Sequence, residues 1–252
     1  MGKTKNVQSL ERAASILELF EENNKPKSVK EIVSILSLSK STVFGLINTL
    51  ANLGYLSQDP ETLKYSLGLK ILSLGNSASG SNLLAKTANP HLTKLSFRFQ
   101  ETCLLAIEEA GFVVYIDKTE STGSIAIRTR IGTKKELYCT GVGKCFLAYM
   151  QKSTAENILS LGTEPKTPNT ITEIHKIWEE LAIIRSQGYA FDNEEFELGI
   201  NCLAVPVFNR NKDIIASICL TGPTGRIKGL NTSEIVEALK ETADAIRHDM
   251  NC

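Results

Sequence analysis

The sequence predicts an α+β protein of two domains, a small N-terminal helical unit and a larger unit built on an antiparallel sheet. Three observations carry this prediction. Residues 1–68 read as three amphipathic helices followed by two short alternating segments. Beyond Thr102 the hydrophobic period changes from 3.6 residues to 2, and strand-like segments stand at both ends of a helical middle. With 252 residues and 42% hydrophobic content, the chain is long enough to fill two cores.

The first two helices are marked by their apolar faces and their ends. The first helix carries one apolar face, made of Leu10, Ala13, Ala14 and Leu17, with Phe20 a turn beyond. It is predicted to end in residues 23–26, where a proline follows two asparagines and a lysine. The second helix begins with a capping box, in which Ser28 and Glu31 satisfy two free amide donors. Its apolar stripe consists of Val29, Ile32, Val33 and Leu36.

The third helix begins at Lys40 and has the pattern of a DNA-reading helix. Its buried stripe is predicted to hold Val43, Leu46, Ile47 and Leu50. The opposite face carries short uncharged residues, namely Ser41, Thr42, Gly45, Asn48 and Asn52. Such residues can approach base edges, and the short turn at 37–39 holds the second and third helices together as a helix-turn-helix.

A β-hairpin is predicted directly after the third helix. Two alternating segments within residues 54–67 flank the Asp59-Pro60 turn. Three helices and a hairpin, or wing, form the order of a winged helix-turn-helix, which binds DNA or serves as an adaptor for other proteins. Charge supports DNA binding only weakly, because residues 1–68 carry eight basic and seven acidic side chains. The lysines near the turn and on the wing still favour one face for DNA.

The chain then changes from helices to strands. A connecting helix is predicted over residues 67–75, followed by a loosening over 76–82 that could be a helix interruption or a hinge. A helix over 83–99, broken near Pro90, leads to strands over 102–108, 112–117 and 124–130.

The remainder of the second domain is predicted as helices, then strands, then one closing helix. The helices cover residues 140–149, 155–161 and 172–187. The strands cover 189–195, 201–208 and 214–220, and the closing helix covers 233–247. Strands at both ends of a helical middle indicate a mostly antiparallel sheet flanked by helices.

Composition excludes several classes of protein. The net charge is zero and the calculated pI is 6.8, so a polyanion or membrane-surface binder is not expected. No apolar run approaches the roughly 20 residues that span a bilayer, and the N-terminus lacks an apolar signal core, so we expect a cytoplasmic protein. The six cysteines are Cys103, Cys139, Cys145, Cys202, Cys219 and Cys252. They show no zinc-ligand spacing with the three histidines, so we expect free thiols, no metal and no cofactor.

Several motifs, taken in order, resemble the IclR family of bacterial transcriptional regulators. They are Ser41-Thr42-Val43 in the third helix, the Tyr-Ser-Leu-Gly of residues 65–68, Gly141-x-Gly143-Lys144 at a helix start, the acidic run at 192–195 leading into residues 199–207, and Thr221-Gly222-Pro223. The resemblance covers nearly the whole chain. It implies a winged helix-turn-helix over residues 1–68, a linker helix over 69–88 and a GAF-like effector-binding domain over 89–252. It also implies a dimer or tetramer that binds paired half-sites on an operator.

The third helix departs from the pattern of this family at two positions. The family often has Tyr-Arg where this chain has Phe44-Gly45, so a guanidinium fork and a phenol are lost, and a helical glycine costs roughly 1 kcal/mol relative to Ala. Either Gly45 permits a close approach of the backbone to DNA or the helix reads a different base sequence, and we favour the second. The candidate DNA contacts are Ser39, Lys40, Ser41, Thr42, Phe44, Gly45, Asn48 and Lys64.

A second candidate site begins at the helix start of residues 141–144. Unpaired backbone amides and the positive end of the helix dipole favour an anion there, and a carboxylate fits. The resemblance implies that the effector, a small organic acid, is bound by Gly141, Val142, Asp192, Cys202, Cys219 and Thr221. Cys219 and Thr221 alternate in phase along one strand, so both can face one cavity.

Other interpretations of these residues stay open. Cys202 and Cys219 could simply pack between strands or act as a redox switch, which would need a lowered thiol pKa. The acidic residues of 192–197 could form a solvated turn, and we expect this more for Glu194, Glu195 and Glu197 than for Asp192. We expect no catalysis, because no segment supplies a nucleophile elbow or a paired acid-base motif.

Overall fold

The computed structural model describes residues 6–21, 25–81, 83–121 and 129–250. It divides the chain into two compact units, residues 1–81 and residues 82–252. Within the described ranges, no single helix has the length and apolar content to cross a membrane. The pair Val29–Leu36 and Lys40–Asn52, bent by 119°, meets that test only when the two helices are taken together.

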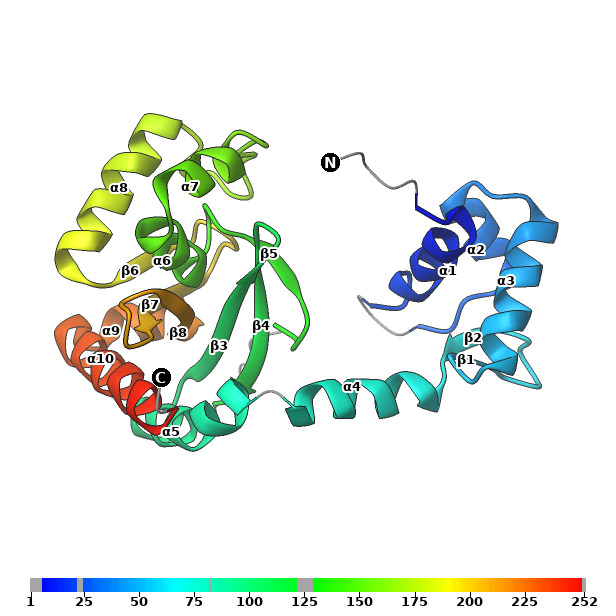
Figure 1. Cartoon of the computed structure of the whole chain (residues 1–252), viewed down its shortest axis with the longest axis horizontal. Helices are drawn as coiled ribbons and strands as arrows, with labels where there is room; N and C mark the ends of the chain where they lie inside the picture. Colours follow the sequence, from blue (N-terminus) through cyan, green and yellow to red (C-terminus); the bar gives the residue numbers. More distant parts are fainter. Residues whose placement is uncertain (1–5, 22–24, 82, 122–128, 251–252) are drawn as a thin grey trace. The chain divides into compact units, whose positions relative to one another are not determined.

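The first unit contains the three predicted helices α1 (Gln8–Glu18), α2 (Val29–Leu36) and α3 (Lys40–Asn52) (Figure 1). The capping box at Ser28 is confirmed, since its hydroxyl accepts from the amide of Glu31 and the Glu31 carboxylate accepts from the amide of Ser28. The predicted face of α1 is partly wrong. Leu10 is 68% exposed and Ala14 is exposed, whereas Ile16 is fully buried, because the face that packs in the core consists of Ala13, Ile16, Leu17 and Phe20.

The predicted wing is confirmed as the antiparallel strands β1 (Leu56–Gln58) and β2 (Tyr65–Leu67). Asp59 shapes the turn between them, because its carboxylate accepts hydrogen bonds from the amides of Glu61 and Thr62 at 3.0 and 2.7 Å. Gly68 ends the wing at a very close approach of two chain segments. A Cβ at this position would lie 2.2 Å from the carbonyl oxygen of Gly54, so the backbone requires glycine here.

Two predicted breaks in the connecting helices are wrong. Helix α4 runs from Leu69 to Ser81, so the small polar residues 76–81 remain helical instead of loosening. Helix α5 runs from Leu83 to Phe99 without interruption at Pro90. Small polar residues and proline each lower the stability of a helix. Proline removes only the one backbone hydrogen bond that its nitrogen cannot donate. Buried residues on both sides of Pro90 hold α5 in place.

The second unit is built on a six-stranded antiparallel sheet in the order β5-β4-β3-β8-β7-β6. The strands are β3 (Thr102–Glu109), β4 (Phe112–Thr119), β5 (Lys134–Glu136), β6 (Ala190–Asn193), β7 (Ile200–Phe208) and β8 (Ile214–Pro223). The predicted antiparallel sheet is therefore confirmed. Strand β5 was not predicted, and the strand expected over residues 124–130 falls mainly on residues outside the described ranges.

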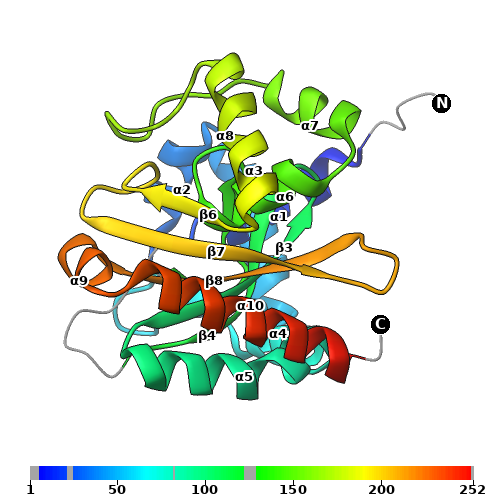
Figure 2. The same ribbon diagram turned by 90° about the vertical axis from the view of Figure 1, so that its left-hand side faces the viewer.

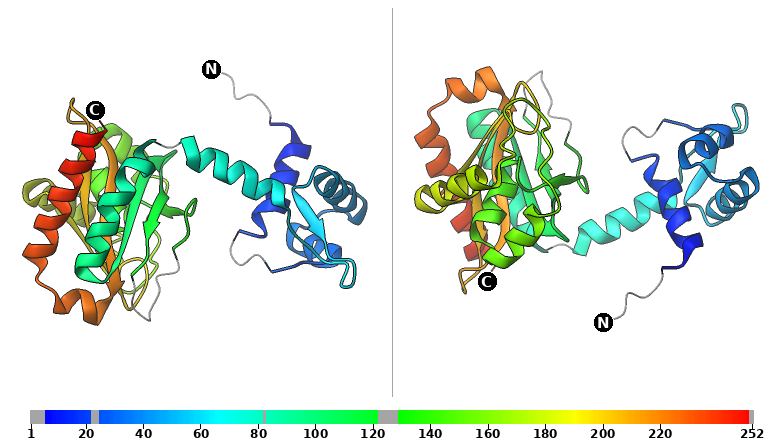
Figure 3. Two further views of the ribbon diagram at one scale, coloured as in Figure 1. Left: turned by 90° about the horizontal axis from the view of Figure 1, so that it is seen from below. Right: turned by 90° about the horizontal axis from the view of Figure 1, so that it is seen from above.

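Helices cover both faces of this sheet. Helices α6 (Gly141–Tyr149), α7 (Lys152–Leu159) and α8 (Ile174–Gln187) lie on one face, and α5 and α10 (Thr232–Asp249) lie on the other (Figure 2). Helices α5 and α10 lie side by side (Figure 3). The short helix α9 (Thr224–Gly229) follows β8 and was not predicted.

The alternation of residues along the strands decides which side chains reach each face. On β8, Cys219 packs in the cluster beneath α6, while Ile218 and Leu220 pack in the cluster beneath α5 and α10. On β7, Cys202 and Ala204 likewise face α6. Cys202 and Cys219 therefore lie on the same face of the sheet as the start of helix α6.

Candidate DNA-binding and effector sites

Helix α3 separates a buried face from an exposed polar face as the sequence predicts. Val43, Ile47 and Leu50 are buried, and Leu46 packs against them. The outward residues Ser41, Gly45 and Asn52 are exposed, and Thr42 and Asn48 are partly exposed. The helix thus offers short side chains on the face that a DNA duplex could reach.

The N-terminus of α3 gathers a second group of the predicted DNA contacts. Ser39 caps the helix, with its hydroxyl accepting from the amide of Thr42 and lying 3.1 Å from the hydroxyl of Ser41. Lys40 is the first helical residue and is exposed. A helix N-terminus with an exposed lysine and hydroxyls suits a phosphate. Lys64 is exposed directly before β2, so it belongs to the wing instead of to this group.

Phe44 and Gly45 give this helix an unusual outer surface. The Phe44 side chain is 51% exposed, which leaves an aromatic ring available to DNA. Nothing lies within 4 Å of the position that a Cβ of Gly45 would occupy. The helix therefore needs no glycine at position 45 for packing, and a larger residue would fit there.

In the second unit, three predicted effector residues form one row across neighbouring strands. Asp192 on β6 pairs with Cys202 on β7, and Cys202 pairs with Thr221 on β8. Cys219 lies on the same face one pair further along β8, opposite Ala204. All four predicted effector side chains are buried. Residues that are up to 29 positions apart in the sequence are therefore neighbours in the sheet.

Helix α6 begins directly over this row. A Cβ on Gly141 would lie 3.2 Å from the Cys202 Sγ atom and 3.3 Å from the Cβ of Ala204, so glycine lets the helix approach the sheet. Val142 is fully buried in the same apolar cluster as Cys202. The structure thus brings all six predicted effector residues together at one end of α6.

The first turn of α6 retains two amides for an anion. The Thr140 hydroxyl accepts from the amide of Gly143 at 3.2 Å, and the amide of Lys144 bonds to the Thr140 carbonyl. Within the described residues, the amides of Gly141 and Val142 have no hydrogen-bond partner. Together with the helix dipole, these two donors can bind a carboxylate.

A buried lysine beside this helix end was missed as a functional residue. Lys144 is 1% exposed, and its Nζ atom lies 2.6 Å from Glu195, 2.7 Å from the Phe191 carbonyl and 3.2 Å from Glu180. Burial alone would lower its pKa, but the charges of Glu195 and Glu180 raise the net pKa above its usual value. The position of this lysine inside the mostly apolar segment 142–147 was the sequence signal that could have identified it.

The solvated-turn interpretation of Glu195 is wrong. Glu195 is 4% exposed because its carboxylate pairs with Lys144, and the hydroxyls of Thr167 and Thr170 hold its carbonyl. Glu197 is exposed, as expected. Glu194 is partly buried, and its carboxylate accepts from the amide of Gly199 at 2.8 Å. Only part of the acidic run is therefore a solvated turn.

Asp192 is poised between its charged and neutral forms. Burial raises its pKa to about 7, although its carboxylate accepts a hydrogen bond from the amide of Glu195 and lies near Lys144. A protonated Asp192 can donate a hydrogen bond to a carboxylate ligand, whereas the ionised form would repel it.

Three buried cysteines, Cys139, Cys145 and Cys202, lie in environments that disfavour the thiolate. A hydrogen bond with the Cys219 thiol, followed by burial, raises the pKa of Cys202 well above its usual value. Burial raises the pKa of Cys139 and of Cys145 to about 12. The thiolate is the reactive form of cysteine, so these environments disfavour a redox switch. Cys252 lies outside the described residues.

Tyr115 is a further residue that the sequence analysis did not single out. It lies on β4, is 7% exposed and packs in the cluster that holds Cys202 and Cys219. Burial, followed by the proximity of these two thiols, raises its pKa well above the usual value. Its hydroxyl is therefore neutral and can take part in ligand binding. The alternation of β4, which places Val113 and Tyr115 inward, was the signal for it.

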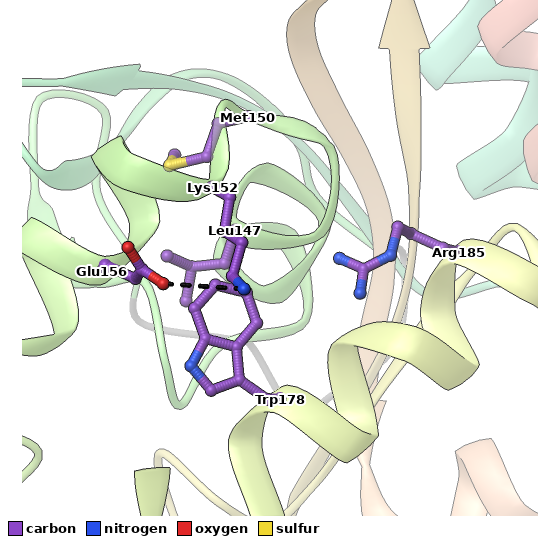
Figure 4. Close-up of a pocket in the computed structure, with 6 residues that line it drawn as sticks. All are labelled: Leu147, Met150, Lys152, Glu156, Trp178 and Arg185. Carbon is purple, nitrogen blue, oxygen red and sulfur yellow. Dashed lines mark ion pairs between the residues drawn. The ribbon is translucent and has the colours of Figure 1, made fainter. Parts of the chain in front are cut away.

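Three pockets lined by described residues contain none of the six predicted effector residues. One of them, of about 430 Å³, lies at the C-terminal end of α6, between that helix, α7 and α8 (Figure 4). It is thus at the other end of α6 from the row of Asp192, Cys202 and Thr221.

A winged helix-turn-helix joined to a helix-flanked antiparallel sheet defines a DNA-binding transcriptional regulator. The chain belongs to the IclR family. A family model described as "Bacterial transcriptional regulator IclR C-terminal" matches residues 77–248, and one described as "IclR helix-turn-helix domain" matches residues 9–60. The family, the fold class and the DNA-binding class predicted from the sequence are therefore confirmed.

Relatives and solved structures agree with this assignment. The chain is 34% identical over 241 residues to the HTH-type transcriptional regulator XynR of Escherichia coli (strain K12), covering 95% of this chain and 96% of XynR. It is 32% identical over 247 residues to the DNA-binding transcriptional repressor YiaJ of the same organism, covering 96% of this chain and 88% of YiaJ. The crystal structure of an IclR transcriptional regulator from Alicyclobacillus acidocaldarius matches with a TM-score of 0.86 at 29% identity, covering 97% and 99% of the two chains.

Proposed function

We propose that this regulator is a repressor whose affinity for its operator is controlled by a small organic acid bound in the second unit. The observation that carries the ligand proposal is the start of α6, where the amides of Gly141 and Val142, which have no partner among the described residues, lie beside the row of Asp192, Cys202 and Thr221. Repression is supported by the likeness to YiaJ. Such a protein acts in the cytoplasm, where bacterial DNA lies.

DNA reading is assigned to α3 and the wing. The exposed residues Lys40, Ser41, Phe44 and Gly45 and the partly exposed Thr42 and Asn48 would face the major groove, with Ser39 and Lys64 near phosphates. Because the reading face is uncharged, the affinity for DNA depends on the phosphate contacts of the few lysines. A winged-helix adaptor remains the alternative if no DNA site is found.

Two copies are needed to read paired half-sites, so we propose a homodimer or homotetramer. Helix α4 supports this proposal, because Leu69 and Leu72 are 83% and 60% exposed and have no cover within the described part of the chain. Large exposed apolar side chains on one helix are typical of an interface. Light scattering after size exclusion would give the number of copies.

The test is selection of genomic fragments by the purified protein, followed by titration with salt and with a panel of organic acids. We expect a short palindromic site whose affinity falls steeply as salt rises, and its release by one acid. Recovery of only weak, sequence-independent fragments would favour the adaptor. Tight specific binding that no acid changes would contradict the effector proposal alone. Loss of DNA binding after mild peroxide would favour the redox switch.

A further inference from the structure

The pocket at the C-terminal end of α6 has the composition of a second ligand site. It is lined by Leu147, Met150, Lys152, Glu156, Trp178 and Arg185 (Figure 4). Its volume of about 430 Å³ falls in the range of small-molecule sites. No residue of the proposed effector site lines it, and it does not depend on the proposed function.

The base of this pocket is apolar. Leu147 is 1% exposed, and the partly buried Met150 and Trp178 pack against the same core cluster. The flat indole offers one face for stacking, which favours a planar or apolar ligand body. Water bound there would gain few hydrogen bonds from these three side chains, so an apolar group that displaces it is favoured.

The rim of the pocket is cationic. The Arg185 Nη1 atom donates to the carbonyl of Ala148 at 3.1 Å, which holds the guanidinium in place while its other donors remain directed at the pocket (Figure 4). The Lys152 Nζ atom lies 5.8 Å from the centre of the Trp178 ring and 3.8 Å from the Glu156 carboxylate. Two cations against one carboxylate leave the rim of the pocket with an excess positive charge.

We propose that this pocket binds a small planar carboxylate. Its ring would stack on Trp178 above Leu147 and Met150, and its carboxylate would pair with Arg185 and Lys152. A guanidinium already fixed by one hydrogen bond loses little freedom on binding, and it matches a carboxylate in a two-bond geometry. A neutral ligand of the same shape would leave the cations unmatched, so charge decides the selectivity.

Trp178 gives a direct readout, because it is the only tryptophan of the chain. The full-length protein is titrated with benzoate, and separately with benzamide, a neutral molecule of the same shape, while tryptophan fluorescence is recorded. We expect a saturable change in fluorescence with benzoate, and an affinity for benzamide that is lower by at least about 10-fold. Arg185→Gln is expected to lower the affinity for benzoate by about 10-fold or more.

Matched variants test whether benzoate binds in this pocket. Lys176→Gln removes an exposed cation from the same helix outside the pocket and should leave the titration unchanged. Lys152→Gln serves as a second pocket variant if Arg185→Gln does not fold. A linear response without saturation, equal responses to benzoate and benzamide, or no effect of either pocket variant would overturn the proposal. So would a response that Thr221→Val abolishes and the pocket variants spare.

Discussion

Two glycines of the first unit differ in what surrounds them. Gly45 on α3 has open space where a Cβ would stand, and its φ angle is that of an ordinary helix. Gly68 at the end of the wing has the carbonyl of Gly54 at 2.2 Å from that position. One glycine is thus free of packing constraint and the other is required by it.

Replacing Gly45 with Ala is therefore expected to stabilise the first unit by roughly 1 kcal/mol, because Ala loses less backbone entropy in a helix. Replacing Gly68 with Ala should destabilise it by about 1–3 kcal/mol, because the two chain segments must move apart. Hydrogen exchange of the α3 amides measures both changes in the full-length protein. Equal effects of the two substitutions would show that the packing around each glycine does not decide how its replacement changes stability.

Asp192 is expected to make the stability of the second unit depend on pH. Its pKa is raised to about 7 in the folded chain from 3.8 in the ordinary state, so the folded form binds more protons between these values. The stability that Asp192 contributes is fully present below pH 3.8 and is lost as the pH rises through about 7. The loss is on the order of 4 kcal/mol.

Urea denaturation from pH 4 to pH 8 would test this for the native protein and for Asp192→Asn, which stays neutral. The difference in unfolding free energy between the two should change across this range and become constant above about pH 8. Asp213→Asn, at an exposed position, is the control for the loss of a carboxylate that is not buried. A constant difference for Asp192→Asn would mean that Asp192 is ionised in the folded chain.

At the scale of elements, one side chain fixes the position of α6. Lys144 joins this helix to α8 through Glu180 and to the segment after β6 through Glu195. Because the start of α6 forms the proposed effector site, this buried ion network also positions the site. Its sequence signal is weak, since a lysine and a glutamate 51 positions apart are brought together only by the fold.

Lys144→Met is expected to destabilise the second unit by about 3–5 kcal/mol, because it leaves Glu195 buried without its cation. The double variant Lys144→Met with Glu195→Leu should recover much of that loss, since no charge is then buried. Chemical denaturation of both variants measures the coupling. A double variant no more stable than the single one would mean that the lysine acts through packing alone.

At the scale of the whole molecule, the proposed function assigns DNA binding to the first unit and ligand binding to the second. Lys40→Ala in the first unit is expected to weaken operator binding and reduce the salt slope by about 1, because one phosphate contact is lost. Thr221→Val in the second unit should raise the effector concentration for half release by roughly 10-fold and spare DNA binding. The measurement is operator affinity against salt and against effector for both variants. Loss of DNA binding in Thr221→Val with an unchanged effector response would contradict this division.

The elements predicted best are those whose own residues decide them. The capping box at Ser28, the stripe of Val43, Ile47 and Leu50, and the turn at Asp59 are local patterns, and each was found as predicted. Predictions that relied on single helix-breaking residues were wrong at Pro90 and over residues 76–81, because a helix tolerates such residues when its neighbours hold it.

By itself, the sequence determined most of the helices and strands, though not β5 or α9, together with the winged helix-turn-helix and the family, since periodicity, caps and motifs are properties of neighbouring residues. Only the tertiary structure decided which distant residues meet. It placed Asp192, Cys202 and Thr221 in one row, buried Glu195 against Lys144, and left Gly45 with open space. Strand register and burial depend on contacts between segments far apart in the chain. Those contacts decide which side chains meet and whether a buried group is charged.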